Sequence, residues 1–282
     1  MEKEWVNMSQ RLKYISRIKD EFDTVICGMN GIIMRGSDIN TENLQALIKI
    51  YQSGKRLMLA SNSGWRVKNL FYFLKDAGVP MNIFQAMITA GEIAHFTLKN
   101  TQAYGTRYYA LTSIAPQLMH GLQYQQVENV HDADFVVAAT DVCGVNTEFC
   151  LPILAKSLQK KLPLFCVGND TLLVNNDNIC SGVGALAEQY AMQGGTIIPF
   201  GKPDTHIAAY LCEHIKNFKK SRCLIIGDAM ATDIRMGNAF GAQTLLITGG
   251  CHQIFQPTAE QINKLSAEYG LNIDYYMESL QW

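Results

Sequence analysis

Residues 224–233 read Leu-Ile-Ile-Gly-Asp-Ala-Met-Ala-Thr-Asp, and this stretch decides the fold. Its apolar start is typical of a buried parallel strand, and two carboxylates, Asp228 and Asp233, follow it closely. In open α/β sheets, ligands bind outside the carboxyl ends of the strands. The stretch therefore predicts a polar site at the end of a buried strand.

Three further segments place glycines or polar residues where a predicted strand or loop ends. They are Ile26-Cys-Gly28-Met-Asn30-Gly31, Leu59-Ala-Ser61-Asn62-Ser63 and Gly201-Lys202-Pro203. Strand side chains alternate between two faces, so positions 28 and 30 are expected to point toward the site while Cys27 and Met29 point away. The four segments are predicted to belong to one site.

Strand and helix patterns alternate along the chain, which predicts an α/β fold with a parallel sheet. The predicted strands are 24–27, 56–60, 85–89, 107–112, 134–139, 163–167, 196–199, 223–226 and 243–247. The predicted helices are 2–20, 41–53, 65–77, 90–100, 147–160, 182–193, 204–217, 232–240 and 258–269. Residues 103–195 form a strand–helix set of their own, which predicts a smaller inserted domain within a core of residues 1–102 and 196–282.

Composition and charge limit the partners that we expect. The net charge is −1 and 17% of the residues are charged, with Lys and Arg scattered, so no nucleic-acid surface is predicted. No apolar run approaches the roughly 20 residues that cross a bilayer, and the N-terminus lacks a signal-peptide pattern. The eight cysteines mostly lie in apolar segments without metal-ligand spacing, which predicts buried thiols in a cytoplasmic protein.

The four segments, in their order along the chain, resemble the haloacid dehalogenase (HAD) superfamily of phosphotransferases. The inserted domain and the forms Gly-Lys-Pro and Gly-Asp-x-x-x-Thr-Asp resemble its class IIA, the NagD-like sugar-phosphatase branch. The resemblance extends from Phe22 to about Ile254. It implies a Rossmann-like parallel-sheet core with an inserted α/β cap domain of the C2 type.

The resemblance also implies which residues are missing from the site. The nucleophilic Asp of the family falls on Gly28, and its acid/base Asp falls on Asn30. Glycine has no nucleophile, and an amide transfers no proton at neutral pH. Neither Asp23, which comes too early on the strand, nor Asp38, beyond the bend, is expected to replace them. The chain is therefore predicted to keep the scaffold of an enzyme without its reactive group.

The remaining family positions are occupied by polar residues. The resemblance assigns phosphate binding to Ser61, Asn62 and Lys202, and magnesium binding to Asp228, Asp233 and the backbone carbonyl of Asn30. Because one carboxylate is missing, Mg²⁺ is expected to bind weakly or not at all. In the cap, Asn169 and Asp170 are expected to contact the substrate, although a strand ending in a polar turn explains them equally well.

Three hypotheses about function follow. The first is a pseudophosphatase that binds a phosphorylated small molecule, or phosphate, without hydrolysing it. The second is an active Mg²⁺-dependent phosphomonoesterase, acting on a sugar phosphate or a nucleotide by a non-standard mechanism. The third is a non-catalytic interaction module, for example a homodimer formed through the cap. The absence of a carboxylate at Gly28 favours the first over the second.

Overall fold

The computed structural model describes residues 9–141, 144–176, 178–213 and 215–282, and the chain divides into two compact units. The first unit comprises Met1–Ala60, Val79–Met87 and Pro203–Trp282, and the second comprises Ser61–Gly78 and Ile88–Lys202. Both units are mixed α/β structures with parallel sheets, as predicted. The second unit contains all of residues 103–195, the predicted inserted domain, together with flanking segments. The bounds of that domain stay a prediction.

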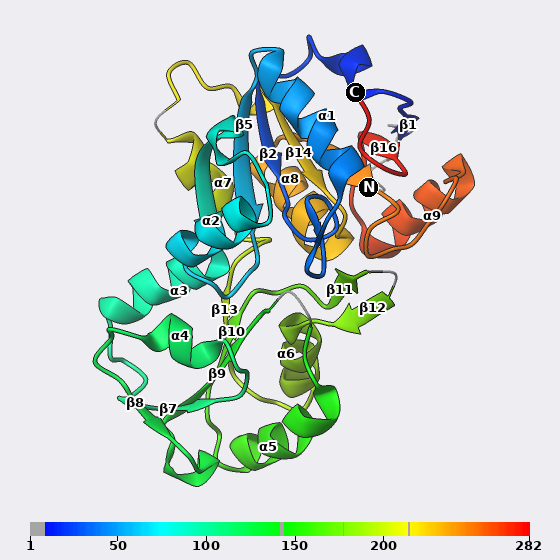
Figure 1. Ribbon diagram of the computed structural model, residues 1–282. Coiled ribbons are helices and arrows are strands. Elements are labelled where there is room, and N and C mark those ends of the chain that lie inside the picture. Colours follow the sequence, from blue (N-terminus) through cyan, green and yellow to red (C-terminus); the bar gives the residue numbers. More distant parts are fainter. Residues whose placement is uncertain (1–8, 142–143, 177, 214) are drawn as a thin grey trace. The chain divides into compact units, whose positions relative to one another are not determined.

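A seven-stranded sheet, in the order β1-β16-β15-β14-β2-β5-β6, organises the first unit (Figure 1). Its strands are β1 (Gln10–Arg11), β2 (Thr24–Cys27), β5 (Arg56–Ser61), β6 (Phe84–Thr89), β14 (Cys223–Gly227), β15 (Gln243–Ile247) and β16 (Tyr275–Met277). β2 and β14 pair in parallel at the centre, and every residue of both strands is buried. Their continuous apolar runs reflect helices on both faces of the sheet.

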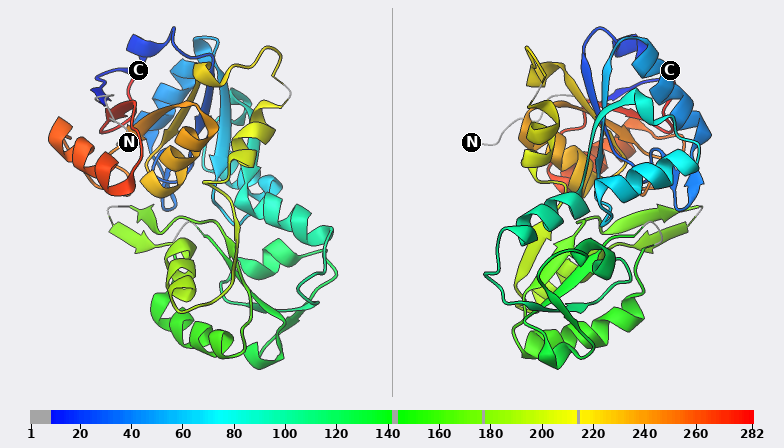
Figure 2. Two further views of the ribbon diagram at one scale, coloured as in Figure 1. Left: turned by 180° about the vertical axis from the view of Figure 1, so that it is seen from behind. Right: turned by 60° about the vertical axis from the view of Figure 1, so that its left-hand side comes forward.

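Helices cover the two faces of this sheet. In the right-hand view of Figure 2, α1 lies on one side and α7 and α8 lie on the other. The helices and helical turns of the unit are η1 (Ile15–Ile18), α1 (Thr41–Gln52), η2 (Met81–Ile83), α7 (Thr205–Cys212), η4 (Lys220–Arg222), η5 (Met230–Ile234), α8 (Arg235–Phe240) and α9 (Ala259–Tyr269). A short hairpin, β3 (Met34–Arg35) and β4 (Asp38–Ile39), follows β2.

A five-stranded sheet, in the order β13-β10-β9-β7-β8, organises the second unit. Its strands are β7 (Arg107–Ala110), β8 (Gln125–Val127), β9 (Phe135–Ala139), β10 (Leu164–Val167) and β13 (Ile197–Phe200), beside a hairpin of β11 (Leu172–Asn175) and β12 (Asn178–Ser181). Its helices are α2 (Val67–Asp76), α3 (Ala90–Lys99), α4 (Ala115–Met119), η3 (Val130–Asp132), α5 (Thr147–Gln159) and α6 (Val183–Met192). Alternate residues of β9 face opposite sides of this sheet. Phe135 and Val137 pack with α3 and α4 on one side. Val136 and Ala138 pack with α5 and α6 on the other.

The predicted helix over residues 2–20 is wrong for its described part. Gln10–Arg11 forms an edge strand and Ile15–Ile18 a 3₁₀ turn, while residues 1–8 lie outside the described residues. The N–H groups of Gln10 and Leu12 donate to the carbonyls of Asp274 and Tyr276, so pairing with β16 takes the place of helical bonds. The apolar side chains of this segment are buried as expected, but on a sheet edge.

One finding bears on membranes. Within the described part of the chain, no helix combines the length and the apolar character needed to span a bilayer.

Candidate functional site

The predicted site residues fall into two groups, one in each unit. Gly28, Asn30, Asp228 and Asp233 lie in the first unit, and Ser61, Asn62, Asn169, Asp170 and Lys202 lie in the second. β5 begins in the first unit and ends at Ser61, the first residue of the second.

Position 28 faces a carboxylate. Register pairs Ile226 with Cys27, and the N–H of Gly28 donates to the carbonyl of Ile226 over 2.8 Å, so β2 and β14 end together. A Cβ at position 28 would lie 3.3 Å from Oδ1 of Asp233. Strand alternation predicts this orientation, and a side chain here would enter the polar site. The glycine leaves that space without a functional group.

The carboxylate of Asp228 is enclosed by backbone. The N–H of Cys251 donates to its Oδ2 over 2.8 Å, and the Cys251 thiol donates to the Asp228 carbonyl over 3.1 Å. Gly31 has a φ of 74°, and a Cβ there would lie 1.9 Å from the same Oδ2. A side chain at position 31 would therefore collide with Asp228, which is only 5% exposed. The role of Cys251 carries no local sequence signal, because its bonds to Asp228 join segments 23 residues apart.

Asp233 lies within the π-helical turn η5, where the predicted helix 232–240 begins. Its side chain is buried, and the N–H of Ala229 lies 3.4 Å from its Oδ2. A Cβ at Gly227 would lie 2.1 Å from the Asp233 Cβ, so the turn packs directly on the end of β14. Single π-turns occur frequently at functional sites because they re-aim a side chain.

Asn30 holds an unsatisfied acceptor. Its Oδ1 is buried and has no hydrogen-bond partner among the described residues. A buried acceptor without a partner costs about 1–3 kcal/mol, so a native structure rarely keeps one without reason. The atom lies next to Gly31, which packs on Asp228. It is a place where a donor or a cation would be stabilised.

The described residues do not form a complete magnesium site. They contain no group of three or more His, Cys, Asp or Glu side chains that could hold a metal ion. Mg²⁺ demands near-octahedral oxygen coordination, commonly with one or two carboxylates free to bind it. Asp228 and Asp233 supply two carboxylates here, whereas Gly28 supplies no side-chain oxygen. The expectation that Mg²⁺ binds weakly or not at all stays a prediction.

His252, which the sequence did not single out, supports the turn that carries Asp233. Its Nε2 accepts from the N–H of Met230 at 3.4 Å, which requires the neutral ring. Burial lowers the pKa of His252, and the nearby Glu268 opposes that shift in part. The unfolded chain therefore binds this proton more readily than the folded protein does.

We expect stability to fall as the pH drops through about 6.5, because protonation of His252 favours the unfolded state. Thermal melts between pH 8 and pH 5 measure this effect. The variant His252→Gln, which does not titrate in this range, should lose less stability over that interval than the wild type. Parallel curves for the two proteins would show that His252 stays solvated in the folded state.

In the second unit, Asn62 connects the Leu59–Ser63 segment with the Gly201–Pro203 segment. Its Oδ1 accepts from the N–H of Lys202 over 2.7 Å, and its Nδ2 donates to Asp170 Oδ1 over 3.0 Å and to the Lys202 carbonyl over 3.4 Å. Gly201 has a φ of 111°, and a Cβ there would lie 2.5 Å from Asn62 Oδ1. The Asn62 side chain therefore fixes the backbone that carries Lys202.

Asn169 and Asp170 contact the same network. Asn169 Nδ2 donates to the carbonyls of Phe200 and Lys202, over 3.2 and 2.9 Å. Asp170 is buried and accepts from Asn62, and Lys202 is only 4% exposed. These two cap residues thus hold Asn62 and the Lys202 segment in place. Their predicted contact with a substrate stays a prediction.

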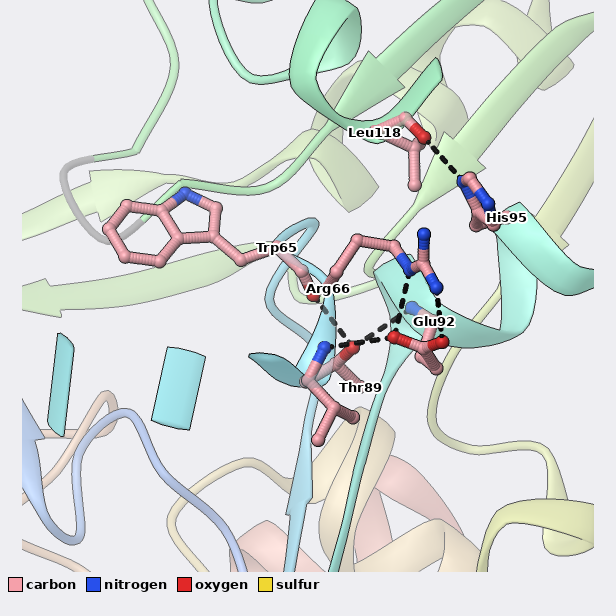
Figure 3. A network of polar contacts seen from close by, with 7 residues as sticks. Trp65, Arg66, Thr89, Glu92, His95 and Leu118 are labelled. Atoms are coloured by element: carbon pink, nitrogen blue, oxygen red, sulfur yellow. Dashed lines mark hydrogen bonds and ion pairs between the residues drawn. The ribbon is translucent and has the colours of Figure 1, made fainter. Parts of the chain in front are cut away.

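A second network, which the sequence analysis missed, fixes the loop after Ser61. The Arg66 guanidinium donates twice to Glu92, over 2.9 and 2.7 Å, and the N–H of Val67 donates to Glu92 Oε2 over 3.0 Å (Figure 3). Thr89 donates to the Trp65 carbonyl over 2.7 Å and caps α3 through the Glu92 N–H. The sequence signal was the Thr-x-x-Glu pattern of a capping box, here turned toward the loop.

Substitution Glu92→Gln is expected to loosen this loop. The pKa of Glu92 lies below its ordinary value, chiefly because Arg66 hydrogen-bonds to it, so the ionised form carries the interaction. Losing charge-assisted bonds at this half-buried site should cost about 1–2 kcal/mol. Hydrogen exchange of the amides in residues 63–67 should accelerate. The exposed Glu128→Gln is the matched control and should leave their exchange unchanged; equal exchange in both variants would contradict the role of Glu92.

Comparisons with known proteins agree on the fold. A profile of the family described as HAD-hydrolase-like matches residues 199–280. The chain is 25% identical over 287 residues to the glycerol-3-phosphate phosphatase of Gallus gallus, which covers 92% of this chain and 89% of that protein.

Solved structures give the same result. A hydrolase of the haloacid dehalogenase-like family from Brucella suis 1330 aligns with a TM-score of 0.80 at 22% identity, over 95% of this chain and 99% of that chain. The glycerol phosphate phosphatase of Mycobacterium tuberculosis, in complex with magnesium, aligns with a TM-score of 0.59 at 20% identity. The alignment covers 83% of this chain and 69% of that chain. These alignments confirm the predicted Rossmann-like α/β fold. The Mycobacterium tuberculosis structure contains magnesium.

Proposed function

We propose that the chain is a member of the haloacid dehalogenase superfamily that binds a phosphorylated small molecule without hydrolysing it. The observation that carries the proposal is the space at position 28. It faces Asp233, where a Cβ would lie 3.3 Å from the carboxylate oxygen, yet glycine puts no group there. Attack on phosphorus needs a nucleophile at this position, and the described residues around it supply none.

The neighbouring position supports the same proposal. Asn30 stands where the family has its acid/base, and its amide gives up no proton at neutral pH. Its buried Oδ1 accepts no hydrogen bond from the described residues, so the atom is available to a ligand donor. An amide at this position can orient a bound group, but it cannot protonate a leaving oxygen.

For phosphate binding we assign Ser61, the main chain of Asn62 and Lys202. The Asn62 side chain is engaged with Lys202 and Asp170, so its contribution to a ligand is its backbone amide. Lys202 is buried, and its backbone is held by Asn62 and Asn169. A lysine and a backbone amide on a fixed frame are suited to phosphoryl oxygens.

We further propose that Mg²⁺ binds weakly at Asp228, Asp233 and the Asn30 carbonyl. These residues alone leave the coordination short of an octahedron, so phosphate binding is expected without added metal.

Calorimetry of wild type and Lys202→Met with inorganic phosphate and with glycerol 3-phosphate tests the proposal. Removing a charge-assisted contact should weaken binding by about tenfold or more. Lys156→Met removes an exposed lysine in the same unit and is the matched control, expected to bind as wild type does. Equal binding by wild type and Lys202→Met, or no binding by any variant, would contradict the proposal and favour the interaction-module hypothesis.

A further inference from the structure

A pocket lies in the first unit, at the edge of the sheet. It has a volume of about 540 Å³ and lies just beyond the carboxyl ends of the parallel strands β1 and β16, which Figure 1 shows side by side. Its lining residues are Arg11, Leu12, Lys13, Arg17, Met277, Glu278, Ser279 and Gln281. None of them belongs to the predicted phosphate or metal residues.

The backbone brings three cations to this pocket. Arg11 and Lys13 stand two residues apart on an extended segment, so their side chains leave the same face while Leu12 is buried. Arg17, on the turn η1, lines the same pocket. The segment is fixed to the C-terminal segment, since the N–H of Leu12 donates to the Tyr276 carbonyl over 3.0 Å and that of Ile15 to the Gln281 carbonyl over 2.8 Å.

These positive charges are not compensated by the protein. None of Arg11, Lys13 and Arg17 forms an ion pair with a residue of the described ranges, and all three are exposed. Glu278 is the one carboxylate among the residues that line the pocket, and its Oε2 accepts from the N–H of Gln256 over 2.7 Å. Ser279 and Gln281 add neutral polar groups. The pocket therefore has a net charge that an anion would neutralise.

We propose that this pocket binds a diphosphate group, either as part of a nucleoside diphosphate or as free pyrophosphate. Three cations that line one pocket match a group with two adjacent phosphates better than a single phosphate, and arginine binds phosphate oxygens in a bidentate way. The volume lies within the roughly 300–1,000 Å³ of ligand pockets. Ligands of α/β sheets bind at the carboxyl ends of the strands, where this pocket lies.

Calorimetry with ADP, AMP, pyrophosphate and inorganic phosphate tests the proposal on the full chain. The variant Arg11→Gln/Lys13→Gln/Arg17→Gln should bind ADP and pyrophosphate at least about tenfold more weakly than wild type, because charge-assisted contacts are lost. The matched control is Lys19→Gln/Lys49→Gln/Lys264→Gln, which removes the same charge from exposed positions outside the pocket and should bind within about twofold of wild type. AMP and phosphate should bind more weakly than ADP. The single variant Arg17→Gln serves if the triple variant does not fold.

Three results would overturn the proposal. They are no binding of either diphosphate to wild type, equal loss in the two triple variants, and loss of diphosphate binding in Lys202→Met. The last result would place the ligand at the proposed phosphate site instead, so the two proposals fail separately. Binding of ADP without pyrophosphate would identify a nucleoside diphosphate, and comparable binding of both would identify the free diphosphate group as sufficient.

Discussion

Purified protein is expected to hydrolyse phosphomonoesters no faster than the uncatalysed background, with or without Mg²⁺. The position that should carry the nucleophile is Gly28, and the neighbouring acid/base position is Asn30. Loss of an essential nucleophile typically costs a factor on the order of 10⁴–10⁶ in rate. A panel of sugar phosphates, glycerol 3-phosphate and nucleotides, assayed for released phosphate, measures this directly.

The control for this assay is Asp228→Ala. A trace phosphatase in the preparation would give a rate that this variant leaves unchanged. Robust turnover that disappears in Asp228→Ala would instead contradict the expectation and support the hypothesis of an active phosphomonoesterase.

The substitution Gly28→Asp is expected to destabilise the metal-free protein by about 2–4 kcal/mol. Its Cβ would lie 3.3 Å from Asp233 Oδ1, which sets two carboxylates against each other in a buried site. Two like charges about 4 Å apart repel by roughly 4 kcal/mol at an effective dielectric constant of about 20, and protonation of one acid limits the cost. Thermal melts without metal report the loss.

Magnesium should reverse much of this loss. The added carboxylate supplies a direct oxygen ligand near Asp233 and Asp228, and a ligand stabilises the state that binds it. Gly28→Asn has a similar size without the charge and serves as the matched control. We expect the Mg²⁺-dependent rise in melting temperature to be larger for Gly28→Asp than for Gly28→Asn or wild type. The same rise in all three proteins would show that position 28 does not face the metal.

The central strands of the first unit could be predicted because their signals are local. β2 and β14 are short apolar runs that end at glycines, and burial on both faces selects such residues. The edge strand β1 could not be predicted in this way. Its two residues pair with β16, which lies more than 250 positions away in the sequence, and the spacing of Leu12, Ile15 and Ile18 suits a helix equally well.

The same distinction applies to the candidate site. The carboxylates Asp228 and Asp233 follow a strand, which predicted a polar site there, and the family resemblance assigned them to magnesium. Alternation along β2 predicted the direction of position 28. Contacts between distant segments were harder to predict. The N–H of Cys251 donates to Asp228 without a local sequence signal, and the Thr-x-x-Glu pattern at Glu92 does not indicate its bonds to Arg66 and to the Val67 N–H. Such contacts depend on which distant segments pack together, and short patterns in a single sequence do not show this.

The central claim is that the protein binds a phosphate ester and leaves it intact. Phosphorus NMR of an equimolar mixture of protein and glycerol 3-phosphate, with Mg²⁺ present, tests both halves in one sample. We predict a shifted or broadened ester signal that persists for hours with no growth of inorganic phosphate, and loss of that shift in Lys202→Met. Accumulation of inorganic phosphate beyond the amount of protein, absent in Asp228→Ala, would contradict the account.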